Sequence, residues 1–244
     1  MANYNTVRRA GSATMGAAID EGLRTHMNKV YGLMSVAMIV TGLVAYAFGS
    51  SDALLSILRD PITLRPNMLG WIVMFAPLGM VMFMGAAVNR MSQAGAQLFF
   101  YGFAALMGLS ISWIFAAYTD ASIAKTFFVT AISFASLSLY GYTTKKDISA
   151  WGSFLIMGVI GLIIAMIVNI FLQSAALDFA VSALGVLIFA GLTAYDTQKI
   201  KTMYLQAAQT GAETGKMAIF GALTLYLDFI NLFMFLLRFM GSRE

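Results

Sequence analysis

Long apolar blocks separated by short polar segments dominate the chain. Seven blocks carry few charges, at residues 30–48, 68–88, 96–118, 124–142, 151–172, 179–198 and 217–237. A helix needs about 20 apolar residues to cross the roughly 30 Å hydrocarbon core of a bilayer. The pattern therefore predicts an all-α polytopic membrane protein with seven transmembrane helices.

The polar breaks between these blocks are short, which predicts antiparallel neighbours in one transmembrane domain over residues 30–244. The preceding segment, residues 1–29, is more polar. Within it, residues 12–28 mix small, apolar and charged side chains, and Ser12 is available as a helix cap. We interpret residues 12–28 as an amphipathic helix on the membrane surface, with a flexible tail as the alternative.

Composition narrows the chemistry. Hydrophobic residues make up 60% of the chain and charged residues 11%, against about 25% charged in an average soluble domain. Cysteine is absent and His26 is the only histidine, so thiolate sites, zinc sites and histidine-dependent triads lack their usual parts. We expect no resident cofactor and no nucleic-acid partner, because the net charge of +4 comes from residues between apolar blocks.

Lysine and arginine placement predicts the orientation. The side that holds the N-terminus collects ten basic residues and the other side five, the latter being Arg59, Arg65, Lys125, Arg238 and Arg243. Basic residues favour the cytoplasmic side. We therefore expect a cytoplasmic N-terminus and, after seven crossings, a periplasmic C-terminus.

Asp228 is the most informative ionisable residue, because it lies near the middle of the block 217–237. An unpaired charge at that depth costs at least about 2.5–3.5 kcal/mol. Helical spacing places polar and small residues on the same face of the helix as Asp228, namely Gly221, Thr224 and Asn231. This polar face indicates a functional site, although a buried aspartate that only fixes packing is the plain alternative.

Asp196 lies near the cytoplasmic end of the preceding block, with Thr193 one turn before it and Lys199 one turn after it. Pairing with lysine at the interface is one interpretation. The other is a pair with Asp228, since two carboxyl groups facing each other in a low dielectric share one proton and act as a pH switch. At 1.5 Å per residue the two depths are about 5 Å and about 18 Å, so the pair requires a helix that continues beyond Lys199 or a last helix that starts above the membrane.

Two further predictions concern the surroundings of this pair. Thr193, Thr224 and Asn231 could add oxygen ligands, so that Asp196 and Asp228 form a transient calcium site. Arg90, at the end of the second block, is either a topology anchor or a latch that stabilises an ionised aspartate.

Three segments resemble the Bax inhibitor family, the transmembrane Bax inhibitor motif proteins. They are GLTAYDTQKIK (191–201), GALTLYLDFINLFMFLLRFMG (221–241) and SLYGYTTKKDIS (138–149). The resemblance extends over the chain from Tyr31 onward. The chain is similar to a bacterial inner-membrane member of the family, because the lysine-rich tail of the endoplasmic-reticulum members is missing.

The resemblance implies six helices around a central seventh and a pH-sensitive calcium leak. In the family the aspartates of the AYD and LYLD motifs, here Asp196 and Asp228, form the pH-sensing pair. Some members also use a helix-two arginine, which Arg90 matches by place, to hold the pore closed. It also implies a possible partner, because some bacterial members are associated with a membrane-bound AAA+ quality-control protease.

Two other functions compete with the leak. An intramembrane aspartyl protease also carries a Tyr-Asp on one helix and an aspartate on the next, but its GxGD and Pro-Ala-Leu motifs are missing here, so we expect no enzyme. A regulator of the membrane protease complex without transport of its own is the alternative that the sequence leaves open.

Overall fold

The computed structural model of the chain describes residues 3–60, 62–63, 65–87 and 90–242. Helices account for the regular elements of this described part, apart from one isolated bridge between Arg59 and Pro66. In chain order they are α1 (Asn3–Gly49), α2 (Asp52–Leu58), α3 (Met68–Ala87), α4 (Gln93–Ile111), α5 (Ile114–Ala117), α6 (Asp120–Thr143), α7 (Trp151–Leu172), α8 (Ala175–Thr210) and α9 (Gly215–Met240).

Six segments of the described chain are long and apolar enough to cross a membrane: Ala18–Gly49, Gln93–Ala117, Asp120–Thr143, Trp151–Leu172, Ala175–Thr210 and Gly215–Met240. The shorter apolar stretch Met68–Phe83 in α3 supplies the seventh predicted block. Residue 88, the last of that block, lies outside the described residues. The protein is an all-α polytopic membrane protein, as the sequence predicts.

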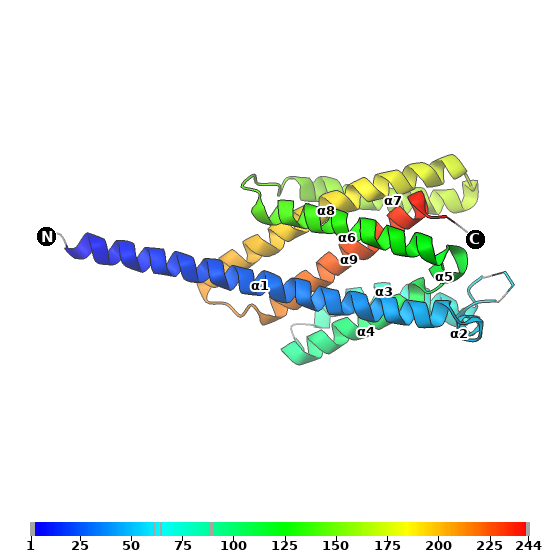
Figure 1. Cartoon of the computed structure of the whole chain (residues 1–244), viewed down its shortest axis with the longest axis horizontal. Coiled ribbons are helices and arrows are strands. Elements are labelled where there is room, and N and C mark those ends of the chain that lie inside the picture. The colour runs from blue at the N-terminus through cyan, green and yellow to red at the C-terminus, as the bar shows by residue number, and fades with distance from the viewer. Residues whose placement is uncertain (1–2, 61, 64, 88–89, 243–244) are drawn as a thin grey trace.

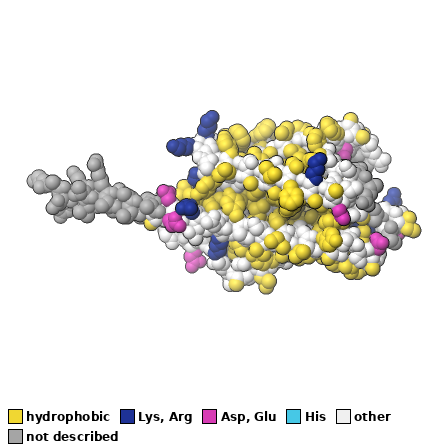
Figure 2. Space-filling view, in the orientation of Figure 1, with side chains coloured by type: hydrophobic (Ala, Val, Ile, Leu, Met, Phe, Trp, Pro, Cys, Tyr) yellow, Lys and Arg dark blue, Asp and Glu magenta, His cyan; other side chains and the backbone are white. Residues whose placement is uncertain are grey.

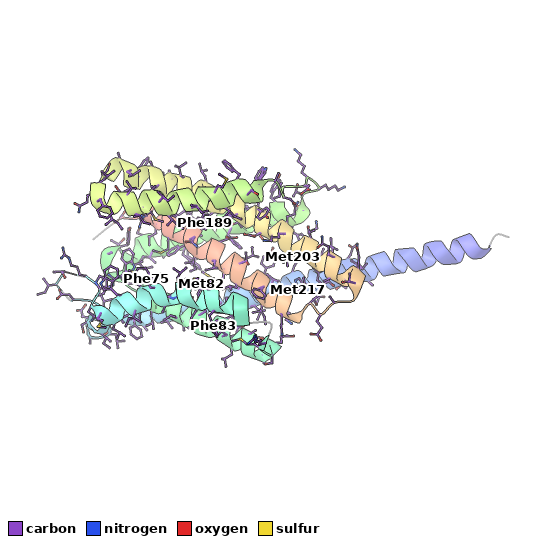
Figure 3. All side chains as sticks on the ribbon, turned by 180° about the vertical axis from the view of Figure 1, so that it is seen from behind. Phe75, Met82, Phe83, Phe189, Met203 and Met217 are labelled. Carbon is purple, nitrogen blue, oxygen red and sulfur yellow. The ribbon has the colours of Figure 1, made fainter. Side chains whose placement is uncertain are left out.

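Helix α9 is the centre of the bundle (Figure 1). It packs against α1, α4, α6 and α8, whereas α3 packs mainly on α4 and α7 on α8. Seen from behind, α9 crosses between the pair α7 and α8 and the pair α3 and α4 (Figure 3). Phe189 of α8, labelled there, stacks on Phe235 of α9 with ring centroids 5.6 Å apart. A central seventh helix is thus present, with α3 and α7 as an outer layer.

The N-terminal segment differs from the prediction. Residues 12–28 do not form a separate helix, because α1 runs without a break from Asn3 to Gly49, and its first part projects beyond the bundle along the same axis (Figure 1). A surface helix at right angles to the span would need a turn near residue 29, and Met27 and Val30 on either side of it are instead buried in the core. Buried side chains across the expected boundary hold the helix straight.

Two local departures lie near the ends of the spans. The block 96–118 is divided into α4 and α5 at Ser112, whose hydroxyl donates to the Leu109 carbonyl (2.9 Å). The short helix α2 had no predicted counterpart. Leu55 and Leu58 on α2 are buried, so tertiary packing stabilises a helix of seven residues that would be marginal alone.

Helix α8 has the extension that the carboxyl pair requires. It continues past Lys199 to Thr210 and ends where Gly211 takes a left-handed conformation (φ 68°), which glycine adopts without a steric penalty. The N-cap is Ser174, whose side chain accepts from the Leu177 N–H (3.3 Å). The next helix, α9, begins only four residues after Gly211, at Gly215.

Candidate functional site

The site consists of two carboxyl groups on the two helices with the most extensive mutual contact, α8 and α9. Asp196 is 9% exposed and Asp228 is 5% exposed. Their side chains lie within hydrogen-bonding reach of each other. The structure thus brings together the two residues that the sequence predicted as a pair, and it does so through the extension of α8.

Close packing of small residues sets the rotation of the two helices. A Cβ atom placed on Gly221 of α9 would lie 3.2 Å from the Ile200 side chain of α8, so the face of α9 that carries Gly221 points at α8. Asp228 lies two turns farther on that same face. The predicted polar face of α9 is therefore the α8 contact face.

One oxygen of the pair receives no hydrogen bond from an N–H or hydroxyl group. Asp228 Oδ2 is buried and has no such donor among the described residues. A carboxyl group donates a hydrogen bond only when it is protonated, so a direct bond between Asp196 and Asp228 uses one shared proton. A buried acceptor without a partner costs about 1–3 kcal/mol, so the neighbouring Asp196 carboxyl group matters for the stability of Asp228 at this position.

Lys199 is the cation that acts on Asp196, one helical turn away. Its ammonium also lies over the Tyr195 ring, 5.8 Å from the centroid. The sequence left open whether Asp196 pairs with lysine or with Asp228. In the structure Asp196 has both neighbours, the carboxyl group on α9 and the lysine charge on its own helix.

The backbone around Asp196 is tightly held. Gly141 of α6 meets the Ala194 carbonyl directly, and a side chain at Gly152 of α7 would collide with the Tyr195 ring. The Ala194 backbone therefore lies against α6 at a position that admits glycine alone, and the Tyr195 ring lies against α7 at Gly152. This clamp fixes the height and rotation of Asp196 relative to α6 and α7.

The three predicted oxygen donors are placed differently from one another. Thr193 is fully buried and donates to the Phe189 carbonyl (2.8 Å). The Asn231 amide donates to the Leu227 carbonyl (2.8 Å), which leaves its side-chain oxygen as an acceptor. Thr224 is partly exposed on the same helix face as Asp228. None of these bonds joins a predicted donor to the carboxyl pair.

Arg90 does not meet the aspartates in this structure. Its side chain is exposed, and no ion pair joins it to either carboxyl group among the described residues. The latch geometry is thus not formed. The position of Arg90 suits the alternative interpretation, a basic anchor at the end of a spanning helix.

A chain of hydroxyl groups near Asp196 was missed by the sequence reasoning. The Tyr31 hydroxyl lies 2.7 Å from the Ser138 hydroxyl, which lies 2.9 Å from that of Thr197, so α1, α6 and α8 are joined. A second missed contact connects α1, α4 and α9: Thr41 donates to the Ala104 carbonyl (2.8 Å) and lies 2.6 Å from the Tyr226 hydroxyl. The only sequence signal was the presence of hydroxyl residues in apolar blocks.

The metal ligands that the sequence predicts at this site are the two carboxyl groups. No group of three or more histidine, cysteine, aspartate or glutamate side chains that could hold a metal ion occurs in the part of the chain that the structure describes. Calcium favours six to eight oxygen ligands, and two adjacent carboxyl groups supply a minority of them. Asp196 and Asp228 as a transient calcium site therefore stay a prediction.

The protein is thus a polytopic helical membrane protein, with a central helix and a buried carboxyl pair where that helix contacts the preceding one. Sequence comparison then gives its family. A family model described as "Inhibitor of apoptosis-promoting Bax1" matches residues 23–244. The chain belongs to the Bax inhibitor family.

Similar proteins match over nearly their full length. The chain is 46% identical to the inner membrane protein YbhL of Escherichia coli over 91% of this chain and 94% of YbhL. It is also 46% identical to an uncharacterized protein of Rickettsia prowazekii, with 92% of each chain covered. An uncharacterized membrane protein of Streptococcus pyogenes is 32% identical over 92% of this chain and 96% of that protein.

Proposed function

We propose that this protein is a pH-sensitive calcium leak channel gated by the protonation of Asp196 and Asp228. The observation that carries the proposal is the contact between two buried carboxyl groups on adjacent spanning helices. Buried ionisable residues in a membrane are costly and mark ion or proton pathways.

The shared proton is the gate in this mechanism. While one proton lies between the carboxyl groups, a hydrogen bond holds α8 and α9 together. Loss of that proton leaves two negative charges in contact inside a low dielectric, where like charges repel strongly. The two helices then separate at the pair, and the carboxylates form an acidic path that attracts a divalent cation.

The oxygen atoms around the pair indicate which ion would permeate. Two carboxylates, the side-chain oxygen of Asn231 and the hydroxyl of Thr224 are hard oxygen donors of the kind that calcium prefers. An incomplete ligand set suits a leak, since an ion must bind weakly enough to leave. Calcium is therefore the transported ion in the proposal and not a resident cofactor.

We further propose that the protein lies in a bacterial inner membrane with its N-terminus in the cytoplasm. The printed location of YbhL and the excess of basic residues on the N-terminal side support this placement. In Figure 2 the Lys and Arg side chains gather at the end of the bundle from which α1 projects, which becomes the cytoplasmic end.

Calcium flux into proteoliposomes, measured across pH 5 to 8, tests the gate. We expect flux to rise with pH in the wild-type protein. Asp196→Asn and Asp228→Asn should lower the flux severalfold and flatten its pH dependence, because an amide at either position cannot lose a proton.

The matched control is Asp147→Asn, which removes an exposed aspartate in the loop between α6 and α7 and should leave the flux profile unchanged. Wild-type flux in both pair variants would overturn the gate. A complete lack of flux in the wild type, together with a stable complex with a membrane protease on copurification, would favour the regulatory function instead.

A further inference from the structure

A groove of about 1040 Å³ runs between α1 and α6. Both helices pack on α9, and Phe229 of α9 lines the groove between them. The hydrogen bond from Tyr31 to Ser138 joins α1 to α6 at one point along it. Since α1 and α6 are spanning helices, the groove opens sideways, toward the bilayer.

The two ends of the groove differ in chemistry. Toward the N-terminal end of α1 it is lined by Arg24 and Asn28, while farther along α1 the lining is Met34, Met38, Ile39 and Leu43. The facing wall on α6 is also apolar, with Phe127, Phe134 and Leu139. A groove with a basic end and an apolar remainder matches a molecule with a negatively charged headgroup and a hydrocarbon tail.

One basic residue, Arg24, lines the polar end of the groove, and a second, Lys201, contacts a lining residue. Arg24 on α1 is 71% exposed and has only a loose contact to Glu21, at 3.6 Å. Lys201 of α8 lies next to the other wall, where it donates to the Tyr142 carbonyl (2.7 Å) and lies over the Tyr142 ring. Tyr142 lines the groove. Figure 2 shows Lys and Arg side chains at this end and hydrophobic surface along the middle of the bundle.

The length of the apolar part agrees with one lipid leaflet. From Tyr31 to Leu43 the helix rises about 18 Å at 1.5 Å per residue, and one leaflet contributes about half of the roughly 30 Å hydrocarbon core. An acyl chain whose headgroup lies at Arg24 thus ends near Leu43. A free anion would leave the apolar length uncovered, and a neutral lipid would bring no negative charge to the exposed Arg24.

We propose that the groove between α1 and α6 is a binding site for one anionic phospholipid of the leaflet on the N-terminal side. The phosphate lies at Arg24 and Asn28, and one acyl chain lies against Met38 and Phe134. The bound lipid covers the hydroxyl pair of Tyr31 and Ser138. The site does not depend on the proposed leak.

Photolabelling of the full-length protein in phosphatidylcholine vesicles tests the site. The probe is phosphatidylglycerol with a photoactivatable diazirine on one acyl chain, and mass spectrometry maps the adducts. We expect adducts on residues 34–43 and 127–139, with protection by excess unlabelled phosphatidylglycerol and none by phosphatidylcholine. Arg24→Gln should weaken this competition about fivefold, the contribution expected of one basic residue at an anionic lipid surface.

A glycine pair on α1 supplies the decisive variant and its control. Gly42 lines the groove, and a Cβ added there meets no atom within 4 Å. Gly42→Leu should therefore fill the groove without disturbing the fold and remove the adducts. Gly32 is equally open but lies outside the groove lining, so Gly32→Leu should label like the wild type.

Two results would overturn the proposal. The first is unchanged labelling of Gly42→Leu, which would mean that lipid contacts the surface without entering the groove. The second is equal competition by phosphatidylglycerol and phosphatidylcholine, which would remove the charge selectivity. A crosslink between two protein copies through α1 and α6, in place of lipid adducts, would assign the groove to a protein interface and equally contradict it.

Discussion

Helices α7 and α9 reverse the relation between hydropathy and burial that soluble proteins follow. In the most apolar 18-residue stretch of α7 the mean hydropathy is 2.8, and 11% of the residues are buried. In the corresponding stretch of α9 the mean hydropathy is 1.9, and 67% of the residues are buried. Lipid tails are as apolar as leucine, so lipid contact requires only hydrophobic side chains. Helix association requires close packing and polar contacts, which is why the less apolar helix occupies the centre.

A matched pair of isoleucine truncations should produce the largest difference between the two helices. Ile219 on α9 is fully buried, and Ile164 on α7 is 56% exposed. Ile219→Ala should cost about 3 kcal/mol, because a cavity remains in a packed interior. Ile164→Ala should stay within about 0.5 kcal/mol.

Reversible unfolding of the purified protein in mixed micelles would measure both isoleucine variants. Equal losses of stability would show that the hydrophobic effect, and not packing, stabilises the bundle.

Glycine substitutions should give a smaller difference in stability between a buried and a lipid-facing position. Gly141 on α6 meets the Ala194 backbone of α8, whereas a Cβ at Gly161 on α7 meets nothing within 4 Å. Gly141→Ala should destabilise the protein by about 2 kcal/mol through overpacking, and Gly161→Ala should be neutral or slightly stabilising through helix propensity.

Thermal unfolding midpoints of the two alanine variants check the glycine prediction. A stable Gly141→Ala protein would contradict the close approach of α6 and α8.

The smallest effect concerns an exposed aspartate that contrasts with the buried pair. In the loop after α2, hydrogen bonds from the Thr63 N–H (2.7 Å), the Thr63 hydroxyl (2.9 Å) and the Ile62 N–H (3.0 Å) lower the pKa of Asp60. A folded-state pKa below the unfolded value stabilises the loop above the ordinary pKa of about 3.9. That contribution is lost as pH falls through the folded pKa.

The amide chemical shift of Thr63, followed by NMR from pH 7 down to pH 2, reports this titration. Its midpoint should lie below the ordinary aspartate pKa in the wild type, and the titration should vanish in Asp60→Asn. Asp52→Asn is the control that keeps it. A midpoint at or above the ordinary value would contradict the loop geometry.

The sequence predicts the spans and the unusual depth of Asp228 because each depends only on position along one helix. Apolar length locates each span, and the depth of Asp228 in an apolar block marks it as unusual. The extension of α8, on which the pairing depends, could be inferred because the residues after Lys199 are good helix formers. With that extension, Asp196 and Asp228 can lie at the same depth in the bundle.

What the sequence could not supply depends on which helices are neighbours. The hydroxyl chain from Tyr31 to Thr197 joins three helices, and no local pattern specifies which hydroxyl meets which. The continuity of α1 depends on core burial of Met27 and Val30. The exposed position of Arg90 likewise follows from the path of the chain after α3, which a helix-end position alone does not fix.

The glycine clamp at Ala194 gives the carboxyl pair a mechanical meaning. Next to Asp196, the Ala194 backbone lies against Gly141 of α6 and the Tyr195 ring against Gly152 of α7. Asp228 belongs to the helix that Tyr226 joins to Thr41 of α1, which in turn bonds to α4. The pair thus lies where α8 and α9 meet, and each of these two helices also has contacts of its own to other helices. The distance between the two carboxyl groups therefore depends on contacts that Asp196 and Asp228 themselves do not make.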